Sequence, residues 1–383
     1  MKSHHKRVLL ALGWYDYRLQ IGIERYAQEH GWSLSTNFAR ERVIPWGWEG
    51  DGILAWLGAG DDLARFVRSA QKPTVDFSLR RPQFRCARVL EDHLHAAHLA
   101  ADHLLARGVE SFVFYSDTAN WAYEERGAAF VAAIKQSGRS CPWWRRHQSK
   151  DYRTGRGEWQ RRLKWLARSL KRTPQPVGIM AANDQLALEV LEACELAKLN
   201  VPEQVAIVGV GNYLLAADAM RIPISSVDTN LELLGYRGAA TLDDLMHGGD
   251  IPARPLRIPA KTLVARKSSD LLAINHPNIA RAMRFIWEHA HEPINVGDVV
   301  KVAAMSRRGL HVTFLQQIGR TPGDEIRRVR LEAAKRMLMD TTEKVESVAM
   351  SCGYQSANSF CVAFKQATGK SPGQFRRESS GSA

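Results

Sequence analysis

The sequence predicts an α/β fold with two lobes built on parallel, doubly wound sheets, followed by an all-α domain. From residue 8 to about 265, short apolar runs alternate with amphipathic helical stretches. Strands that alternate with helices form parallel βαβ units with right-handed crossovers. About 260 residues is long for a single sheet of this kind, which favours two lobes. Beyond residue 277 the strand-like runs stop, and only helices are predicted.

The elements of the first half follow one another in a regular order. Residues 8–12 are predicted to form a buried strand rather than part of a signal peptide, because the apolar run is short and lacks a small-residue cleavage pattern. Later strands are predicted at "DGILAW", "PTVDF", "SFVFYS", "PVGIMAA" and "VAIVGVG". Helices are predicted at "DDLARFVRSA", "RGAAFVAAIKQSG" and "DQLALEVLEACELAKL". No run approaches the roughly 20 apolar residues of a membrane-spanning helix.

A polar stretch, "ARKSSDLLAINHPNI", separates the two halves. We therefore expect an α/β domain at residues 1–265, a linker at 266–277 and a helical domain at 278–383. The helices of the last part are predicted at residues 277–290, 296–305, 306–318, 322–339, 345–352 and 356–368.

The composition restricts the possible partners. The chain has 53 Lys and Arg against 40 Asp and Glu, a net charge of +13, which suits a polyanion such as nucleic acid or anionic lipid. Residues 281–383 hold 16 Lys and Arg and 10 Asp and Glu, so positive charge is denser there. Five scattered Cys residues without a C-x-x-C pair indicate neither a disulfide framework nor a thiolate metal site, as expected for reduced thiols in the cytoplasm.

The helical domain contains the same small unit twice, at about residues 296–318 and 345–368. In each unit a serine can cap the second helix, and a glycine followed by a proline ends it. These residues are Ser306, Gly319 and Pro322 in the first unit and Ser356, Gly369 and Pro372 in the second. Apolar residues four apart, which share one helical face, are Leu310 with Phe314 and Phe360 with Phe364. Two short helices joined by a tight turn form a helix-turn-helix, whose second helix fits the major groove of DNA.

This part of the chain also resembles the AraC/XylS class of transcription regulators, from about residue 279 to 377. The resemblance rests on the motifs LxxxFxxxxGxTPxxxIxxxRLxxAxxxL and VxxVAxxCGYxSxxxFxxxFKxxxGxSPxxFR. It implies two recognition helices that read adjacent major-groove faces of double-stranded DNA. The implied DNA-binding residues are Arg307, Arg308, His311 and Val312 in the first unit, and Ala357, Asn358, Cys361, Val362 and Lys365 in the second.

Two of these positions depart from the pattern of the class. Val312 and Val362 stand where the class usually has arginines. Arginine reads guanine through two hydrogen bonds, whereas valine contacts only a thymine methyl group. Base specificity is therefore expected to depend on the basic residues of the first helix and on Asn358. The implied phosphate contacts are Lys301, Arg320, Lys365 and Lys370.

The first half resembles the sugar-binding, periplasmic-binding-protein-like domains of LacI-class repressors. The matching stretches include "GIERYAQEHGW", "VLEDHLHAAHLAADHLLARGVESFVFYSD" and "MAANDQLALEVLEACELAKLNVPEQVAIVGVGN". The order of the two halves is that of xylose-responsive regulators. The resemblance implies a monosaccharide effector in the crevice at the carboxyl ends of the strands. The implied effector-binding residues are Trp14, Asp16, Asp92, Trp121, Arg126, Asn183 and Asp184.

Two features leave alternatives open in the effector site. Asp92 and Asp184 can also be helix N-caps. Gly211, in "IVGVGN", stands where the family usually has a sugar-binding aspartate, so the effector can be xylose, another pentose or a related monosaccharide, or the effector can have been lost.

Other classes of function have weaker support. A sugar-modifying enzyme with an accessory basic tail would need catalytic groups in the crevice, where only Asp92 and Asp184 are candidates. A transport-linked binding protein is disfavoured by the missing signal peptide and the DNA-binding tail. The histidines of "EDHLHAAHLAADHLL" lack an H-E-x-x-H pattern and are interpreted as a helix surface, and "PWWRRHQSK" as a loop or edge packing patch.

The sequence therefore predicts a cytoplasmic, sequence-specific transcription regulator without catalytic residues, metal ligands or cofactors. We expect it to activate sugar-catabolic genes, with a monosaccharide bound between the lobes as effector. The expected partners are operator DNA, a second copy of the chain in a homodimer and RNA polymerase, but no membrane.

Overall fold

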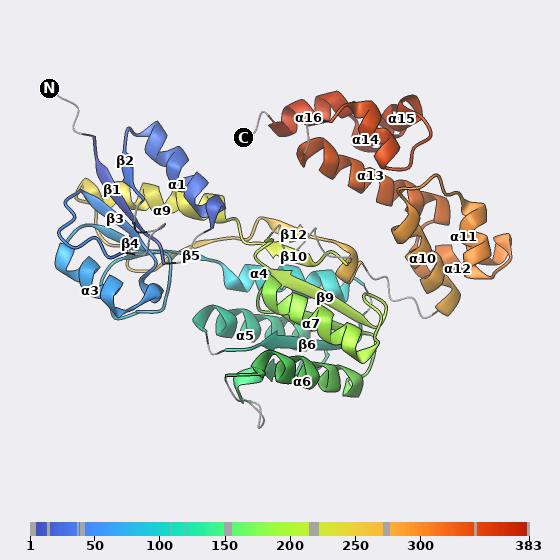
Figure 1. Cartoon of the computed structure of the whole chain (residues 1–383), viewed down its shortest axis with the longest axis horizontal. Helices are drawn as coiled ribbons and strands as arrows, with labels where there is room; N and C mark the ends of the chain where they lie inside the picture. The colour runs from blue at the N-terminus through green and yellow to red at the C-terminus, as the bar shows by residue number, and fades with distance from the viewer. Residues whose placement is uncertain are drawn as a thin grey trace. The chain divides into compact units, whose positions relative to one another are not determined.

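The computed structural model describes residues 5–13, 16–36, 38, 43–107, 109–118, 120–148, 155–213, 222–270, 276–340 and 343–380. The chain forms two compact units, Met1–Asp270 and Leu271–Ala383 (Figure 1). The first unit is α/β and the second is helical in its described part, which confirms the predicted fold class. The predicted domain limits themselves stay a prediction.

Lobe 1 of the first unit is built on a six-stranded sheet with the order β11-β5-β4-β3-β1-β2. Its strands are β1 (Arg7–Ala11), β2 (Ser33–Ser35), β3 (Gly52–Ala55), β4 (Thr74–Asp76), β5 (Ala87–Glu91) and β11 (Leu256–Ile258), all paired in parallel. Val8 and Leu10 pack with α1 (Tyr17–Glu29) and α9 (Leu231–Met246) on one face. Leu9 and Ala11 pack with α3 (Asp61–Ala70) on the other. The predicted strand at residues 8–12 is thus a buried strand of this sheet.

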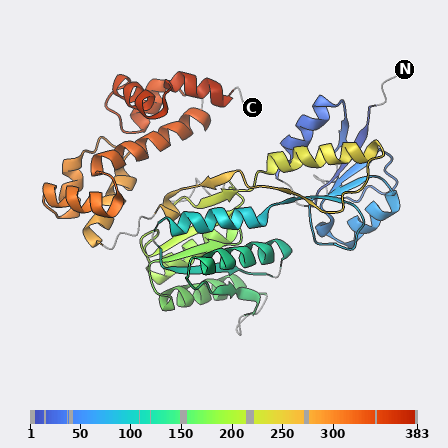
Figure 2. The same cartoon turned by 180° about the vertical axis from the view of Figure 1, so that it is seen from behind.

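Lobe 2 is built on a second six-stranded sheet with the order β12-β10-β9-β8-β6-β7. Its strands are β6 (Ser111–Ser116), β7 (Trp143–Arg145), β8 (Val177–Ala181), β9 (Val205–Val210), β10 (Ser225–Asp228) and β12 (Thr262–Val264). Only β12, at the edge, pairs antiparallel. The helices α6 (Glu158–Arg172) and α7 (Asp184–Ala197) pack together on one face, and α4 (His93–Leu105) and α5 (Trp121–Gln136) on the other (Figures 1 and 2).

The chain passes repeatedly between the lobes. It leaves lobe 1 after β5 to enter α4, returns from β10 to α9, and crosses again between β11 and β12. This places the carboxyl ends of β5, β8 and β9 beside the passage between the lobes, where parallel sheets bind ligands. Short 3-10 helices lie at Leu57–Ala59, Arg146–Gln148 and Lys267–Ser269.

The second unit consists of two small helical cores joined by one long helix. The first core is formed by α10 (Pro277–His289), α11 (Val296–Ala303) and α12 (Arg307–Ile318). The second is formed by α14 (Val345–Ser351), α15 (Ala357–Thr368) and α16 (Pro372–Ser380). The connecting helix α13 (Pro322–Asp340) contributes Ile326 to the first core and Ala334 and Leu338 to the second. Within the described residues, no helix is both long enough and apolar enough to span a membrane.

Candidate DNA-binding surface and effector crevice

The first helix-turn-helix unit consists of α11, a short turn and α12. Ser306 caps α12, since its side chain accepts a hydrogen bond from the Gly309 N–H. Leu310 and Phe314 are fully buried, as their four-residue spacing predicts, and pack with Val299 of α11. The opposite side of α12 is left in solvent.

The second unit, α14 and α15, repeats this arrangement. Ser356 accepts a hydrogen bond from the Ser359 N–H, and Phe360 and Phe364 are fully buried. Both recognition helices end at a left-handed glycine, Gly319 with φ 72° and Gly369 with φ 74°. The next helix begins at a proline in both units, as the sequence predicts.

The predicted DNA-binding residues lie on the solvent side of these two helices. In α12 Arg307, Arg308, His311 and Val312 are all exposed. In α15 Asn358, Val362 and Lys365 are exposed, whereas Ala357 and Cys361 are half-buried. Each set is therefore available to a partner on one helical face, although contact with bases stays a prediction.

The two units are held together where the second turn meets the end of α10. Gly353 has φ 77°, and a Cβ atom there would lie 2.3 Å from the Ala290 carbonyl oxygen. Arg330 of α13 donates to the carbonyl oxygens of Ala290, Glu292 and Ile294 at 2.8, 2.7 and 3.2 Å. These two residues, both in the family motifs, hold the recognition helices in one fixed frame.

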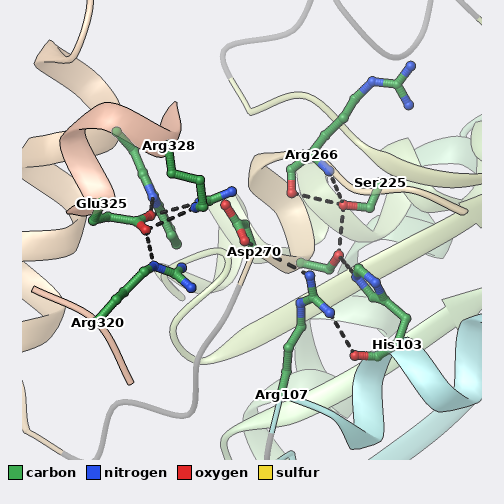
Figure 3. Close-up of polar contacts among 10 residues, drawn as sticks. His103, Arg107, Ser225, Arg266, Asp270, Arg320, Glu325 and Arg328 are labelled. Carbon is green, nitrogen blue, oxygen red and sulfur yellow. Dashed lines mark hydrogen bonds and ion pairs between the residues drawn. The ribbon is translucent and has the colours of Figure 1, made fainter. Parts of the chain in front are cut away.

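A buried acid stabilises the first helix-turn-helix unit from within. Glu325 is fully buried and accepts hydrogen bonds from Arg320, Arg328 and the indole of Trp287 (Figure 3). Burial alone would raise the pKa of Glu325, but the hydrogen bonds and charge of its partners, Arg328 foremost, hold it below its ordinary value. Arg320, a predicted phosphate contact, is thus already paired with Glu325.

The α/β unit, Met1–Asp270, contains a crevice of about 480 Å³ lined by both of its lobes. Lobe 1 contributes Asp16, Arg18, Trp56, Arg80, Glu91 and Leu231; lobe 2 and the segments next to it contribute Asn120, Trp121, Ala122, Tyr123, Arg126, Asn183, Asp184, Gln185, Val210, Gly211, Tyr213 and Thr229. Aromatic rings and carboxylates at strand ends characterise this lining. Five of the seven predicted effector-binding residues, Asp16, Trp121, Arg126, Asn183 and Asp184, therefore come together here.

Of the other two predicted residues, the structure describes only Asp92, which does not line the crevice. Trp14 lies outside the described residues. Asp92 caps α4, because its side chain accepts a hydrogen bond from the His95 N–H at 2.9 Å. Its neighbour Glu91, the last residue of β5, lines the crevice instead.

Arg126 lines the crevice, is buried, and makes hydrogen bonds to three protein groups. It donates to His93, to the Ala182 carbonyl and to Glu91, at 3.1, 2.7 and 3.1 Å. The pKa of His93 is lowered, first by burial and then by the charge of Arg126, so the imidazole is neutral and can accept this hydrogen bond. The arrangement positions the carboxylate of Glu91 rather than presenting a bare guanidinium.

Asp184, like Asp16, is a buried carboxylate of the crevice. Its oxygens accept hydrogen bonds from the Ser226 hydroxyl at 2.5 Å and the Tyr213 N–H at 2.7 Å. Burial raises its pKa, and these hydrogen bonds oppose that rise. Gly211 lies beside it with φ 124°, a backbone conformation that a side chain rarely adopts.

Asn212, next in the chain, connects the two lobes and the segment that leaves the sensor. Arg18 of lobe 1 pairs with Asp16 through two hydrogen bonds and also donates to the Asn212 carbonyl at 3.1 Å. The side-chain oxygen of Asn212 accepts from Arg266 at 2.8 Å, and its amide donates to Asp228 at 3.2 Å. Arg266 opens the stretch predicted as a linker.

The first residues of that stretch are buried in lobe 2. The Ser225 hydroxyl bonds both the N–H and the carbonyl of Arg266 and also contacts the hydroxyl of Ser269 (Figure 3). Ser269 in turn shares a 2.6 Å hydrogen bond with His103, whose pKa burial lowers to about 3. Thus residues 266–269 are fixed to the sensor, whereas residues 271–275 lie outside the described part.

The remaining histidine and aromatic signals have structural explanations. In the described part of the chain no group of three or more His, Cys, Asp or Glu could hold a metal ion. In "PWWRRHQSK", Trp143 packs edge-on against Phe114, and Arg146 is buried. The second observation agrees with an edge packing patch. The interpretation of the histidines as a helix surface is wrong for His93, which is fully buried where it accepts the hydrogen bond from Arg126.

Comparisons with known proteins agree with this two-part structure. Residues 101–269 match a periplasmic binding protein-like domain, and residues 299–378 match a helix-turn-helix domain. The xylose operon regulatory protein of Escherichia coli is 27% identical over 376 residues, which cover 94% of each chain. The chain is a DNA-binding transcription regulator. These matches support the expectation that it is not an enzyme.

Two further relatives extend the comparison. The xylose operon regulatory protein of Haemophilus influenzae is 28% identical over 292 residues, covering 75% of this chain and 74% of that protein. A solved structure described as the xylose-binding transcription activator xylR aligns over 98% of this chain and 99% of its own, with a TM-score of 0.73 and 25% identity. The regulator thus shares the order and fold of both halves with that solved structure.

Sequence reasoning missed several crevice residues that the regulator contains. Arg18, Arg80, Glu91 and Tyr213 carried no motif of their own. Glu91 could have been found from the alternation of side chains along a strand. Successive side chains point in opposite directions, so when Asp92 caps α4, Glu91 at the end of β5 points the other way. Nothing in the local sequence marks Arg18 or Tyr213.

Proposed function

We propose that this regulator activates sugar-catabolic genes in response to a monosaccharide bound between the two lobes of its sensor. The supporting observation is the crevice of about 480 Å³, in which Trp121 and Tyr123 lie among buried carboxylates and amides. Aromatic faces stack on the C–H face of a sugar, and carboxylates accept hydrogen bonds from its hydroxyls. The relatives are named for xylose, which makes a pentose the first candidate.

The crevice differs from a xylose site of the expected type at one strand end. Gly211 supplies no side-chain acceptor there, and both oxygens of the neighbouring Asp184 already accept hydrogen bonds from protein groups. A sugar hydroxyl that the usual aspartate would bind therefore lacks its partner at this position. We propose that the effector is a pentose or related monosaccharide that needs no hydrogen bond to a side chain at this position.

The proposed signal passes through Asn212. Closure of the lobes around a ligand changes the contact between Arg18 and the Asn212 carbonyl, and Arg266 ties the Asn212 side chain to the segment leading toward the DNA-binding unit. A ligand that binds one arrangement better shifts the population toward it. Binding of effector and of DNA is then coupled reciprocally.

The regulator is further proposed to act as a cytoplasmic homodimer that recruits RNA polymerase. Two copies place their recognition helices on repeated half-sites, whose spacing the paired sensors set. Sedimentation of the full chain with and without DNA tests the dimer. A chain that stays monomeric on its DNA site overturns that part of the proposal.

The effector assignment is tested by thermal unfolding of the full chain with a panel of monosaccharides. A ligand at about 100 times its Kd stabilises the native state by about 2.7 kcal/mol, so the right sugar raises the Tm. Trp121→Ala should abolish this rise, whereas Trp159→Ala, an exposed tryptophan on α6, should preserve it. A panel in which no sugar raises the Tm of the wild-type chain refutes the sensor assignment.

The coupling route has a separate test. Asn212→Gly keeps the left-handed backbone, φ 51°, but removes the side chain that Arg266 binds. The variant should still show the sugar-dependent rise in Tm, while its affinity for DNA no longer responds to the sugar. An unchanged DNA response would show that the signal takes another route.

A further inference from the structure

The positive charge of the regulator is concentrated outside its DNA-binding unit. Residues 135–172 contain thirteen Lys or Arg and only two Asp or Glu, a net charge of +11. The whole chain carries +13, and residues 281–383, with 16 Lys and Arg against 10 Asp and Glu, carry +6. The densest positive segment therefore belongs to lobe 2 of the sensor.

The centre of this segment is α6, whose two sides differ sharply. Leu163, Leu166 and Leu170 are buried against the sheet and α7. Lys164, Arg168 and Lys171 are exposed and follow one another at intervals of four and three residues. At 1.5 Å rise per residue this row runs for about 10 Å along the helix. Arg156, before the helix, and Arg172, at its end, are exposed as well.

The acids near α6 neutralise only part of this charge. Glu158 and Glu189 both pair with Arg162, which faces α7 rather than solvent. The other acids on α7 are Asp184, buried in the effector crevice, Glu192, half-buried, and Glu195, exposed. Within the described residues, Lys164, Lys171 and Arg172 form no ion pair. The exposed side of α6 is thus a continuous basic surface, named here the α6 surface: Arg156, Lys164, Arg168, Lys171 and Arg172.

Duplex DNA fits this surface better than other polyanions do. Each strand of the duplex carries one negative charge per about 3.4 Å, so the 10 Å row can face about three phosphates of one strand. The helix-turn-helix unit is part of the same chain, so DNA bound to it is tethered to lobe 2 and its effective concentration there is raised. An anionic membrane is less suitable because the apolar side of α6 is buried in the core, and single strands would need several exposed aromatic rings.

We propose that the α6 surface is a second, sequence-independent DNA-contact site that binds phosphates flanking the operator. It supplies affinity for long DNA and leaves base recognition to α12 and α15. The occupied length of DNA then exceeds the site that the recognition helices read.

The test compares the full wild-type chain with Lys164→Gln/Arg168→Gln/Lys171→Gln. The probes are duplexes of about 20 and about 60 bp that share one site, selected from a random library by the wild-type chain. The control, Arg65→Gln/Arg68→Gln/Lys72→Gln, removes the same charge from exposed positions on and beside α3 of lobe 1. Affinity is measured at several salt concentrations, and Tm is used to verify folding.

On the long duplex the α6 variant should bind about tenfold more weakly, and the slope of log K against log salt should flatten by about 2 to 3. Its affinity for the short duplex should be unchanged, and the control should bind both as the wild type does. Equal losses in the α6 variant and the control on the long duplex, or none in either, overturn the proposal. Binding to vesicles with anionic lipid is measured for the same three chains. If the α6 variant loses affinity for these vesicles and not for the long duplex, the proposal is overturned and the surface is assigned to a membrane.

Discussion

The two helix-turn-helix units follow one sequence frame, offset by fifty residues, but stabilise it differently. Ser306 and Ser356 cap the recognition helices at equivalent positions. Three residues after the start of the helix that follows, the first unit has Glu325 and the second has Phe375. Glu325 anchors a buried network of hydrogen bonds, whereas Phe375 packs edge-on against Phe364 at 5.4 Å. The same frame thus has an ionic support in one unit and an aromatic support in the other.

The exposed faces of the two recognition helices also differ in charge, and the first unit is again the more charged one. The face of α12 carries two arginines and a histidine, whereas that of α15 carries Asn358, Val362 and one lysine. The first unit is therefore charged both inside and at its DNA face, and the second is largely neutral. This comparison teaches that one duplicated motif can divide its roles, with the first unit expected to be the more sensitive to salt and pH.

The largest expected effect comes from the joint between the units. Gly353→Ala would place a Cβ atom 2.3 Å from the Ala290 carbonyl and 2.8 Å from that of Glu292, at φ 77°. We expect a loss of about 3 kcal/mol in the free energy of unfolding, because the contact is with backbone that cannot move aside. Urea unfolding of the full chain measures the change, and DNA affinity should fall with it.

Gly369→Ala is the matched control for this substitution. Gly369 has φ 74° but nothing within 4 Å of a Cβ atom, so only the left-handed strain of about 1 kcal/mol applies. If both variants lose the same stability, the contact with α10 carries no weight and the two units are not joined as described.

The second prediction separates the two kinds of support by pH. Glu325→Gln should cost about 2 kcal/mol, because charged hydrogen bonds to Arg328 and Arg320 are lost. The pKa of Glu325 is lowered in the folded state, so its stabilisation is fully present above its ordinary pKa of 4.5 and is lost as pH falls through the folded value. Unfolding followed between pH 3 and 6, in steps of about one unit, measures both effects.

Phe375→Leu tests the aromatic support in the same way. Phe375 is half-buried, and its replacement should lower stability by an amount that does not change over this pH range. A Glu325→Gln chain that loses stability in acid as steeply as the wild type would contradict the ionic role of Glu325.

The repeated frame could be predicted from sequence because its signals are local. Caps, terminal glycines and apolar pairs four residues apart act within one or two turns of helix, and they define each unit without tertiary information. The ionic support could not be predicted. In "TPGDEIRRVR" Glu325 looks like an exposed charge of an amphipathic helix, and only the indole of Trp287 and the packing around it reveal that it is buried.

In the crevice too, residues with a local sequence signal could be predicted, whereas contacts between distant residues could not. Asp184 and Asn183 follow a strand directly, and that position brings them to the carboxyl edge of the sheet. The contact between Arg18 and Asn212 joins residues 194 positions apart, so no local pattern could signal it. The step from Asp92 to Glu91 shows how one residue at a strand end decides which side chain lines the crevice.

The third prediction concerns the DNA faces of the two units. Arg308→Ala should weaken binding to the selected site by about 1 to 3 kcal/mol and relax preference at one base position, if Arg308 reads guanine. Val362→Ala, in the second unit, should cost less than about 1 kcal/mol, because only a methyl contact is removed. Competition between the selected site and single-base variants measures both.

Lys365→Ala distinguishes a phosphate contact from base reading. It should weaken binding to all sequences alike and reduce the salt slope by about 1. An Arg308→Ala chain that shows this same uniform loss would place Arg308 on the backbone, and the proposed division between the recognition helices would then disappear.

The smallest expected effect lies in the turn of the first unit, where Ala304 adopts φ 50°; the left-handed residue in the turn of the second unit is Gly353, one position earlier in the fifty-residue frame. Alanine pays a steric cost in this left-handed conformation, so Ala304→Gly should raise the free energy of unfolding by about 0.5 kcal/mol, after the greater flexibility of glycine in the unfolded chain is subtracted. Gly319→Ala, at φ 72° with open space around it, should change stability in the opposite direction by about 1 kcal/mol. Urea unfolding resolves the two signs, and a loss of stability in Ala304→Gly would mean that the methyl group of Ala304 makes a packing contact worth more than the strain it causes.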